Sequence, residues 1–418
     1  MSIPNYDDGI NFADLAASDA DFAKHYQNGR VNFQDPDAVQ QLTFSLLRRD
    51  FSLTLSLPPT RLCPPVPIRW SYILFISRLL HSISPQSPSL KGLDIGTGAS
   101  AIYPLLFTSP RSPLRATLHA TEIDALSLSF AARNIATNAL ADRITLHHTS
   151  PSDPLLPLDN LGIHALDFCV CNPPFYESGA ELLALAQGKD EPPSAVCTGS
   201  ETEMVCPGGD EGFVMRMVGE SKALAGRVRW YSSMLGKLAS VYGVVEGLKK
   251  AGCGNWVVGV LKGGRKTRRW VVAWNWTGER VGMDLVRGEE VPRGLWGGVT
   301  EQTVRTERKG VEGRLDKVFG DLDIRWRWVE EGVGAGEARE NVWSRSARRK
   351  RTKDQKGRAG DMTMEGVDGS AACETQVAAL AFRITVQEEG FDVRWLRGKD
   401  PVLFESLCGM LKRAVNPP

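Results

Sequence analysis

The sequence has no pair of cysteines in a CxxC arrangement, although it contains eight cysteines in 418 residues. Their spacing suits neither a zinc site nor a disulfide scaffold, so we expect a reducing compartment. Long apolar runs are also missing. The longest near the start, WSYILFISRLL, is interrupted by Arg78 and is too short to span a bilayer. The first ten residues are acidic and polar, so we expect no signal or transit peptide.

Net charge is nearly absent, because 50 Lys and Arg balance 49 Asp and Glu. The balance is uneven along the chain. Residues 1–224 hold 15 basic and 24 acidic residues, whereas residues 225–418 hold 35 and 25. This asymmetry predicts an anionic partner for the C-terminal half without identifying it. Internal repeats are also lacking.

Between residues 90 and 280, short apolar runs alternate with segments of helical periodicity. The expected strands are KGLDI, RATLHATEID, RITLHH and ALDFCV, and the expected helices are GASAIYPLLF, ALSLSFAARNIATNAL and FVMRMVGESKALA. Such alternation predicts a parallel sheet covered by helices on both faces. WVVGVLK and RWVVAWNW are expected to close that sheet as an antiparallel pair.

The flanking regions differ in character. Residues 1–60 are polar and helical in pattern, and a further helix is expected around residues 70–82 after a proline-rich link. Residues 177–212 are rich in Gly, Pro and Ser and predict a long mobile loop. The C-terminal third mixes short strands, a final helix and a basic insertion too polar to pack. We therefore divide the chain into residues 1–68, 69–280 and 281–418, with disorder at about 344–372.

The segment LDIGTGAS follows the first strand of the alternation and opens a helix. Gly96 and Gly98 let a ligand approach the backbone closely, and the helix N-terminus offers free N–H groups. With Ala101 the segment also fits G-x-G-x-x-A, a dinucleotide-binding fingerprint. Glu122 ends the next strand, where a carboxylate can accept both hydroxyls of an adenosine ribose. NAD and S-adenosylmethionine share that ribose, so Glu122 does not separate them.

Asp94, two residues before the first glycine, favours S-adenosylmethionine. A carboxylate there can meet the α-ammonium of a methionine moiety, but it would repel a pyrophosphate. Ser100 and Arg69 could hold the α-carboxylate. A surface position or a contact with an RNA phosphate is the alternative for Arg69.

The strand ALDFCV leads into CNPPFYES, where two prolines remove two backbone donors and fix two φ angles. An isolated N-P-P is more often a turn. Ligands of parallel sheets, however, bind at the carboxyl ends of strands, where the Gly-rich turn also lies. Asn172 and the carbonyl of Pro173 then form a rigid pair of acceptors that makes an exocyclic amino group nucleophilic. Phe175 offers a face on which an extruded or unpaired base can stack.

The combination of D-x-G-x-G, an acidic strand end and N-P-P-F about 75 residues further on predicts an amino-group methyltransferase. The sequence resembles the adenine-N6 methyltransferases of the U6 spliceosomal RNA type, whose bacterial relatives modify large-subunit ribosomal RNA. The resemblance covers roughly residues 10–280 and is carried by NGRVNFQDPDAVQQLTFSLLRRDF, VPIRWSYI, GLDIGTGASAIYPLL, ATEID, DFCVCNPPF, RVRWYSSMLGK and GRKTRRWVVAWNW. The tail more loosely resembles the family's eukaryotic RNA-binding region in ENVWSRSARRKR, ALAFRITVQEEG and VRWLRGKDPVLFESLCGMLKR.

The resemblance implies a Rossmann-like class I methyltransferase sheet, with an N-terminal helical RNA-binding extension and a C-terminal α+β domain. It implies S-adenosyl-L-methionine as cofactor and structured RNA, specifically U6 snRNA, as partner, with no metal, membrane or obligate protein partner. The implied catalytic residues are Asn172, Pro173, Pro174 and Phe175. The cofactor-binding residues are Arg69, Asp94, Gly96, Gly98, Ser100, Glu122 and Asn172. The RNA-binding residues are Lys24, Arg30, Arg48, Arg49, Arg229, Lys237, Arg265, Arg268, Arg348 and Arg349.

Two segments depart from the family's pattern. The loop after N-P-P-F contains QGKDEPPSAVCTG where relatives are often arginine-rich, which puts an RNA contact by this loop in doubt. HHTSPSD, after the third strand, has few charges, and we expect no cofactor contact from it.

Other interpretations stay open at this point. A protein-glutamine N5 methyltransferase is one alternative, because it binds the amide of its substrate with the same kind of acceptor pair. A methyl-donor-responsive RNA-binding regulator is another, and it would need little catalysis. The basic run 344–358 suits a nuclear import signal, an RNA contact or a solvated insertion. We expect a nuclear protein, with the cytoplasm left open. Cys169 and Cys171 are expected to be small buried hydrophobes, and a core role is expected for Trp270, Trp274, Trp276, Trp326, Trp328 and Trp395.

Overall fold

The computed structural model describes residues 3–83, 89–181, 199–264, 267–344, 347 and 378–416. The chain forms two compact units. The first comprises residues 1–276 with 287–297, and the second comprises residues 277–286 with 298–418. Residues 287–297 thus return to the first unit, where Val291 and Leu295 join its hydrophobic core.

The first unit is built on a seven-stranded sheet of order β5-β4-β3-β6-β7-β9-β8. Its strands are β3 (Leu90–Ile95), β4 (Ala116–Glu122), β5 (Ile144–His148), β6 (Leu166–Cys171), β7 (Val228–Leu235), β8 (Trp256–Lys262) and β9 (Arg268–Trp274). The five strands from β5 to β7 are parallel, and β9 runs antiparallel between β7 and β8. The predicted parallel sheet and its antiparallel closing pair are confirmed.

Strand β7 was not expected, because RVRWYSSML mixes arginines and serines with its apolar residues. Its serines are nevertheless fully buried, and Ser232 Oγ donates to the carbonyl of Cys169 at 2.6 Å. A buried hydroxyl is tolerated in a sheet when it is hydrogen-bonded.

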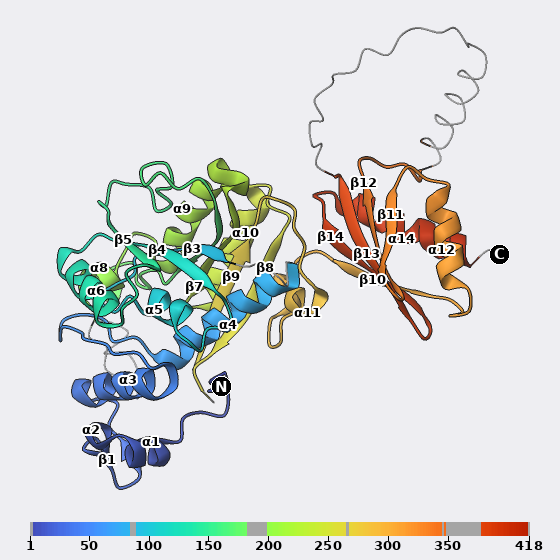
Figure 1. Ribbon diagram of the computed structural model, residues 1–418. Helices are drawn as coiled ribbons and strands as arrows, with labels where there is room; N and C mark the ends of the chain where they lie inside the picture. The colour runs from blue at the N-terminus through green and yellow to red at the C-terminus, as the bar shows by residue number, and fades with distance from the viewer. Residues whose placement is uncertain are drawn as a thin grey trace, which may run out of the picture. The chain divides into compact units, whose positions relative to one another are not determined.

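Helices cover both faces of this sheet (Figure 1). On one face α5 (Ile102–Thr108) places Phe107 against Phe168 of β6, with 4.9 Å between ring centroids. On the other face α9 (Gly209–Leu224) and α10 (Leu238–Lys250) pack on a core that contains Cys169 and Cys171. Both cysteines are buried and unpaired by disulfides, which confirms them as small hydrophobes. Helices α4 (Val66–Ile83) and α6 (Ala125–Thr137) complete the layer around α5.

The N-terminal segment forms α1 (Phe12–Ser18), α2 (Ala20–Ala23), the hairpin β1 (Tyr26–Gln27) and β2 (Arg30–Val31), and α3 (Pro36–Phe51). These dark-blue elements lie together in Figure 1. Asp19 caps α2 and Asp35 caps α3 by accepting backbone N–H bonds, and Pro36 lies in the first turn of α3. An extended linker follows and is held by α6, since the side chain of Asn134 both accepts from Ser56 N and donates to Ser56 O.

The expected loop at 177–212 is shorter than predicted. Residues 182–198 lie outside the described part, but α8 (Glu201–Met204) forms within the interval and α9 already begins at Gly209. Ser200 and Glu203 form a capping box around α8, so four residues are enough to make a helical turn. This reciprocal pair was the local signal that the compositional argument overlooked.

The second unit contains an antiparallel sheet of order β10-β14-β13-β12-β11. The strands are β10 (Glu301–Arg305), β11 (Arg325–Glu330), β12 (Val333–Ala338), β13 (Leu380–Gln387) and β14 (Gly390–Arg397). Helices α12 (Val311–Gly320) and α14 (Pro401–Val415) share one core with Phe382 and Trp395 of this sheet. This unit also contains the short helix α11 (Met283–Val286), whereas the short 3-10 helices η1 (Ala225–Arg227) and η2 (Arg293–Leu295) belong to the first unit.

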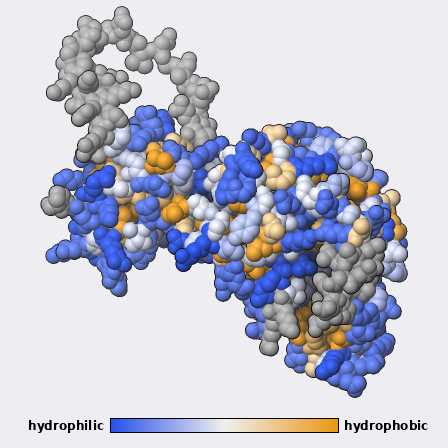
Figure 2. All heavy atoms as spheres, turned by 180° about the vertical axis from the view of Figure 1, so that it is seen from behind, coloured by the Kyte–Doolittle hydropathy of each residue, from blue (hydrophilic) through white to orange (hydrophobic). Residues whose placement is uncertain are grey.

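The tryptophans serve packing. Trp274 and Trp395 are fully buried, and the indole N–H groups of Trp276, Trp326 and Trp328 bond Ser221 or Asp316. On the face shown in Figure 2, hydrophobic residues form scattered spots within a hydrophilic surface. Among the described residues, no helix combines the length and apolarity needed to cross a membrane.

Candidate active site

A cavity of about 400 Å³ lies at the carboxyl ends of β3, β4 and β6. It is lined by seven of the residues proposed for the cofactor or the chemistry, namely Arg69, Gly96, Gly98, Ser100, Glu122, Asn172 and Pro174. Asp94, Pro173 and Phe175 are not among its lining residues. The structure therefore brings the Gly-rich turn and the N-P-P-F segment to one crevice, as expected for strands that run in parallel.

The Gly-rich turn is shaped for close approach by a ligand. Gly96 and Gly98 both have φ of +67°, a conformation that L side chains rarely adopt, and a Cβ built at Gly96 would meet nothing within 4 Å. Open space at that position leaves the backbone accessible from the cavity.

Glu122 holds this turn from the neighbouring strand. Its Oε2 accepts from Gly98 N at 2.8 Å, and its Oε1 accepts from the N–H groups of Ile123 and Asp124, both at 2.8 Å. Burial raises the pKa of Glu122, and these three backbone bonds oppose that shift. Glu122 thus organises the Gly-rich turn as well as lining the cavity, a second task that its position in the sequence did not predict.

Asp94 is a carboxylate that is buried near the carboxyl end of β3. It is 1% exposed, and neither of its oxygens has a hydrogen-bond partner among the described residues. Burial raises its pKa to about 7, and the nearby Thr97 hydroxyl and the charge of Arg69 oppose that rise only in part. A buried acid without partners is costly unless a ligand completes it, so the site fits a group that supplies a positive charge. The α-ammonium of a methionine moiety is such a group.

Arg69 is buried rather than exposed, so the surface alternative for this residue is wrong. It lies on α4, and its Nη1 donates to Asn172 Oδ1 at 2.6 Å and to the hydroxyl of Tyr103 at 3.0 Å. Its Nε has no partner among the described residues. The guanidinium therefore fixes the side chain of Asn172 while keeping a donor for a further acceptor in the cavity.

The N-P-P-F segment leaves β6 at Cys171. The side chain of Asn172 is half-buried. The ring of Phe175 rests against Gly236, where an added Cβ would come within 3.0 Å of Phe175 Cδ1. Asp210 fixes that glycine by accepting from its N–H at 2.7 Å. A glycine favours this close packing, because a Cβ at position 236 would force the aromatic ring to shift by a few tenths of an ångström.

The segment that follows is held by the end of α8 and the residues just after it. Tyr176 N donates to Met204 O at 3.0 Å, and Cys206 N donates to Tyr176 O at 2.9 Å. This short parallel bridge joins the N-P-P-F segment to the wall of the cavity to which Glu203 and Cys206 belong.

Most of the cations expected to bind RNA are paired with carboxylates. Salt bridges join Lys24 to Asp21, Arg48 to Asp19, Arg49 to Asp50, Arg229 to Asp167, Lys237 to Glu181 and Arg268 to Glu290. Arg30 is exposed on β2. Arg229 lies near the amino end of β7, at the sheet edge opposite the cavity, so the structure does not bring it to the site. Arg265, Arg348 and Arg349 lie outside the described residues, as does most of the basic run 344–358.

Sequence reasoning missed several residues of the site. Arg269 of β9 lies with its guanidinium carbon 6.0 Å from the ring centroid of Phe175, and burial followed by the charge of Arg69 lowers its pKa. The loop after β5, to which we assigned no cofactor contact, contributes Thr149, Ser150, Pro151 and Asp153 to the lining of the cavity. Counting charges could not have found Thr149, Ser150 and Pro151, because small uncharged residues can line a pocket through their backbone. Asp153 carries a charge and was overlooked. The linker residues Leu62 and Pro64 line it as well.

The chain matches a family model described as RNA methyltransferase over residues 4–278. It belongs to this family. The U6 small nuclear RNA (adenine-(43)-N(6))-methyltransferase of Schizosaccharomyces pombe is 35% identical over 93% of this chain and 96% of its own length. The human RNA N(6)-adenosine-methyltransferase METTL16 is 41% identical over 63% of this chain and 48% of its own length, so the chain spans about half of that relative.

A solved structure of the human METTL16 catalytic domain in complex with the MAT2A 3′UTR hairpin 6 has a TM-score of 0.56 at 37% identity, covering 64% of this chain and 93% of that chain. The N-terminal domain of the same human protein in complex with SAH has a TM-score of 0.52 at 35% identity, covering 64% of this chain and 94% of that one. The resemblance to the U6-type methyltransferases and the Rossmann-like methyltransferase sheet are confirmed. No group of three or more His, Cys, Asp or Glu suited to a metal occurs in the described residues.

Proposed function

We propose that this RNA methyltransferase transfers a methyl group from S-adenosyl-L-methionine to the N6 amino group of an unpaired or flipped adenine in structured RNA, and that U6 snRNA is a substrate. The observation that carries the proposal is the direct bond from Arg69, in the cavity wall, to Asn172 of the N-P-P-F segment. It joins the pocket that suits a methyl donor to the acceptor pair that suits an amino group. The S. pombe relative, which is similar along nearly its whole length, supports the choice of RNA.

The residues of the cavity, together with the buried Asp94 next to its lining residue Ile95, fit S-adenosylmethionine. Asp94 would take the α-ammonium, since its two buried oxygens have no partner among the described residues. Glu122 would accept one ribose hydroxyl with the lone-pair site that its three backbone bonds leave free. Arg69 and Ser100 would hold the α-carboxylate, and Gly96 and Gly98 would allow close approach. When bound, the cofactor supplies an electrophilic methyl group. The human relative solved with SAH, the demethylated donor, supports this assignment.

On the other side, Asn172 Oδ1 and the carbonyl of Pro173 would accept the two protons of an adenine amino group. These bonds draw the nitrogen lone pair out of conjugation with the ring, which raises its nucleophilicity. Arg69 donates to the same Asn172 oxygen and so fixes the orientation of the amide, which leaves the second lone pair for the amino group. Phe175 would stack on the base, and the nearby Arg269 would face the phosphate of the flipped nucleotide.

RNA would contact the molecule outside the cavity as well. In the N-terminal segment, Arg30 is exposed and belongs to a hairpin. In the second unit, Arg325, Arg327 and Arg383 are exposed on the sheet, and none forms a salt bridge with another described residue. The residue pairs Arg327–Ala335 and Ala335–Arg383 lie in one row across three strands, so the two arginines flank a small side chain. Glu337 lies opposite Arg325, so the basic part of this face is the row that contains Arg327 and Arg383. Such a row suits phosphates. Because U6 snRNA is a spliceosomal RNA, we also propose a nuclear location.

The test replaces Asn172 with Ala. Turnover of a hairpin RNA at saturating donor should fall by roughly 10²–10³-fold, because an interaction made with the reacting nitrogen is lost in the transition state. Titration with SAH should give a dissociation constant within a few-fold of the wild type, since Asp94 and Glu122 remain. The formation of N6-methyladenosine would be measured by mass spectrometry after a single turnover.

Near-normal turnover by this variant would refute the mechanism in which Asn172 and the carbonyl of Pro173 accept the protons of the adenine amino group. If the wild-type chain binds the hairpin tightly and methylates no adenine, the protein acts as a binding regulator instead. Methylation of a glutamine peptide, with none on RNA, would favour the protein-glutamine alternative.

A further inference from the structure

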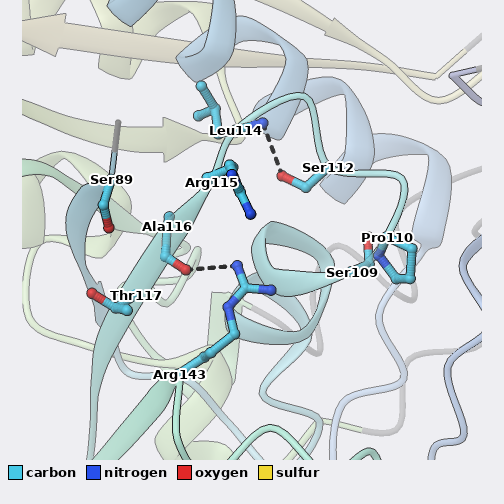
Figure 3. A pocket seen from close by; sticks show the side chains of 9 residues that line it. All are labelled: Ser89, Ser109, Pro110, Ser112, Leu114, Arg115, Ala116, Thr117 and Arg143. Atoms are coloured by element: carbon cyan, nitrogen blue, oxygen red, sulfur yellow. Dashed lines mark hydrogen bonds between the residues drawn. The ribbon is translucent and has the colours of Figure 1, made fainter. Parts of the chain in front are cut away.

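A second pocket, of about 540 Å³, lies at the edge of the sheet where β3 and β4 begin, opposite the edge that holds the active-site cavity. Figure 3 shows the side chains that line it. It is formed where β3 and β4 begin, together with the loop that follows α5 and the residue just before β5. Its lining residues are Ser89, Ser109, Pro110, Ser112, Leu114, Arg115, Ala116, Thr117 and Arg143. None of these is acidic, two are arginines and four carry hydroxyl groups. The lining therefore suits an anion with several oxygen atoms.

The two arginines keep their charge available. Arg143 donates through Nη1 to Thr108 O and through Nη2 to Ala116 O, both at 2.8 Å, and these neutral carbonyls do not cancel its charge. The side chain of Arg115 is exposed, and it forms no hydrogen bond or ion pair with the residues that the structure describes. In Figure 3 both side chains extend into the space bounded by Ser112 and Thr117.

The loop that forms one wall contains the sequence Ser109-Pro110-Arg111-Ser112-Pro113-Leu114-Arg115. Proline-directed protein kinases act on serines followed by proline, and many of them favour a basic residue three positions after the serine. Ser112 meets both conditions through Pro113 and Arg115. Ser109 also precedes a proline, but it is buried, donates to Leu106 O at 2.8 Å and is followed at the third position by a serine.

Ser112 is also accessible in a way that Ser109 is not. It is half-buried, lies outside any helix or strand, and its Oγ accepts only from Leu114 N at 3.2 Å among the described residues. Its hydroxyl proton is therefore available for transfer, and its oxygen already lies at the rim of the basic pocket.

We propose that Ser112 is a phosphorylation site and that this pocket holds the resulting phosphate, with Arg115 and Arg143 as its cationic partners. In the transfer, Ser112 Oγ forms a bond to the γ-phosphorus of a nucleoside triphosphate held by the kinase. The bond from that phosphorus to the β,γ-bridging oxygen breaks, and the nucleoside diphosphate leaves. The hydroxyl proton passes to the base of the kinase. The product carries close to two negative charges and three strong acceptor oxygens beside two guanidinium groups.

Helix α5 links this pocket to the active-site cavity within the first unit. Arg143 bonds the carbonyl of Thr108, the last residue of α5, and the first turn of α5 places Ile102 and Tyr103 in the wall of the active-site cavity. A phosphate bound by Arg143 would therefore tie down the loop at one end of this helix. Its main effect is to order and stabilise the loop, because charge-assisted bonds replace solvent contacts.

The experiment treats the full-length chain with a cyclin-dependent, proline-directed kinase and ATP, and locates the phosphate by mass spectrometry. We expect one phosphate, on Ser112, with loss of incorporation in Ser112→Ala and retention in the matched control Ser109→Ala. Phosphorylation should raise the unfolding temperature by about 2–4 °C, the scale of one or two added charge-assisted bonds.

Arg115→Lys separates recognition by the kinase from binding in the pocket. Lysine keeps the basic residue that the kinase favours but cannot make the paired bonds of a guanidinium. This variant should be phosphorylated to a similar extent and should lose about half of the thermal shift. Absence of phosphate on Ser112, or modification of Ser109 alone, would refute the proposal that Ser112 is a phosphorylation site. Phosphorylation of Ser112 with no thermal shift would overturn the role of the pocket.

Discussion

Asp94 and Glu122 lie near the carboxyl ends of the adjacent strands β3 and β4, yet their surroundings differ. Glu122 accepts three backbone N–H groups, whereas neither oxygen of Asp94 has a partner among the described residues. Hydrogen bonds favour a carboxylate, and burial without them favours the neutral acid. The protein itself therefore supplies hydrogen-bond donors to Glu122, whereas the oxygens of Asp94 are available to a ligand.

This difference predicts a pH dependence for cofactor binding. Burial raises the pKa of Asp94 from 3.8 to about 7, so the carboxyl is largely protonated at pH 6 when no ligand is bound. A positively charged ammonium needs the ionised form. The association constant for SAH, measured by isothermal titration, should therefore rise as pH increases from 6 to 7.5, with a slope approaching about tenfold per unit below the pKa.

The Asp94→Asn variant is the matched control, because it keeps the shape and removes the titration. Its affinity for SAH should be lower than that of the wild type above pH 7 and nearly independent of pH. For unfolding the sign is the opposite. An acid whose folded pKa is raised loses stability as pH increases from its ordinary value to the raised one, so the wild type should become less stable relative to the variant between pH 4 and pH 7. A wild-type binding constant that does not change between pH 6 and 7.5 would refute the assignment of Asp94.

At the scale of elements, α6 joins the N-terminal linker to the Gly-rich turn. The Asn134 amide accepts from Ser56 N at 2.8 Å and donates to Ser56 O at 3.0 Å and to Ala99 O at 2.9 Å. One buried side chain therefore pairs with the linker as a neighbouring strand would, and it also bonds the turn that lines the cavity. Sequence position alone did not suggest this role, since the asparagine lies within an ordinary amphipathic helix.

Replacing Asn134 with Ala should lower the free energy of unfolding by about 2–4 kcal/mol, because it leaves several buried backbone groups without partners. It should also raise the dissociation constant for SAH, because the Gly-rich turn loses a support. Asn138→Ala is the matched control. Asn138 makes the same two bonds to Thr54 one turn later, but it is half-buried, and water can replace its bonds.

Denaturant unfolding and SAH titration of the two variants would check this. Equal losses of stability in both variants, with unchanged SAH binding, would contradict the link between the linker and the cofactor turn.

At the scale of the whole molecule, charge is separated between the regions. The sequence places an excess of acid in residues 1–224 and an excess of base in residues 225–418. In the structure, exposed arginines without salt bridges to described residues occur on the sheet of the second unit, as at Arg327 and Arg383. Many cations of the first unit are instead neutralised by neighbouring acids. Phosphate binding by the second unit is the expected consequence.

Replacing Arg327 and Arg383 together by Gln in the full-length chain should weaken binding to a long structured RNA. It should also flatten the dependence of log K on log salt, by up to about 0.7–0.9 for each phosphate that the variant no longer neutralises. The methyl-transfer rate on a short saturating hairpin should stay unchanged, because Asn172 and its cavity belong to the first unit. Filter binding at several salt concentrations and single-turnover assays would measure both.

The charge-matched control replaces Lys412 and Arg413, exposed on α14, by Gln. If the control flattens the salt dependence as much as the sheet variant, the second unit acts through its net charge and not through this face. If the sheet variant slows methyl transfer at saturation, the second unit completes the active site.

Much of the site could be predicted from sequence because its residues lie next to strand ends. A parallel sheet gathers the carboxyl ends of its strands at one edge, so Gly96, Glu122 and Asn172 had to converge once the strands were assigned. The loop 149–153 and the linker at Leu62 escaped notice. Thr149, Ser150, Pro151 and Leu62 carry no charge, and the single carboxylate of Asp153 forms no motif with its neighbours. Strand β7 escaped because its buried serines resemble those of a loop until their hydrogen-bond partners are known.

The sequence by itself determined the strand–helix alternation, the Gly-rich turn and the rigid N-P-P-F segment, because each depends on local backbone geometry and on short spacings. Only the tertiary structure decided that Arg69 is buried against Asn172, that Asp94 lacks a partner among the described residues while Glu122 has three, and that Arg115 and Arg143 share a pocket with Ser112. These facts concern pairs of residues distant along the chain. Burial and pairing are set by how the elements pack, and a local pattern carries no record of that packing.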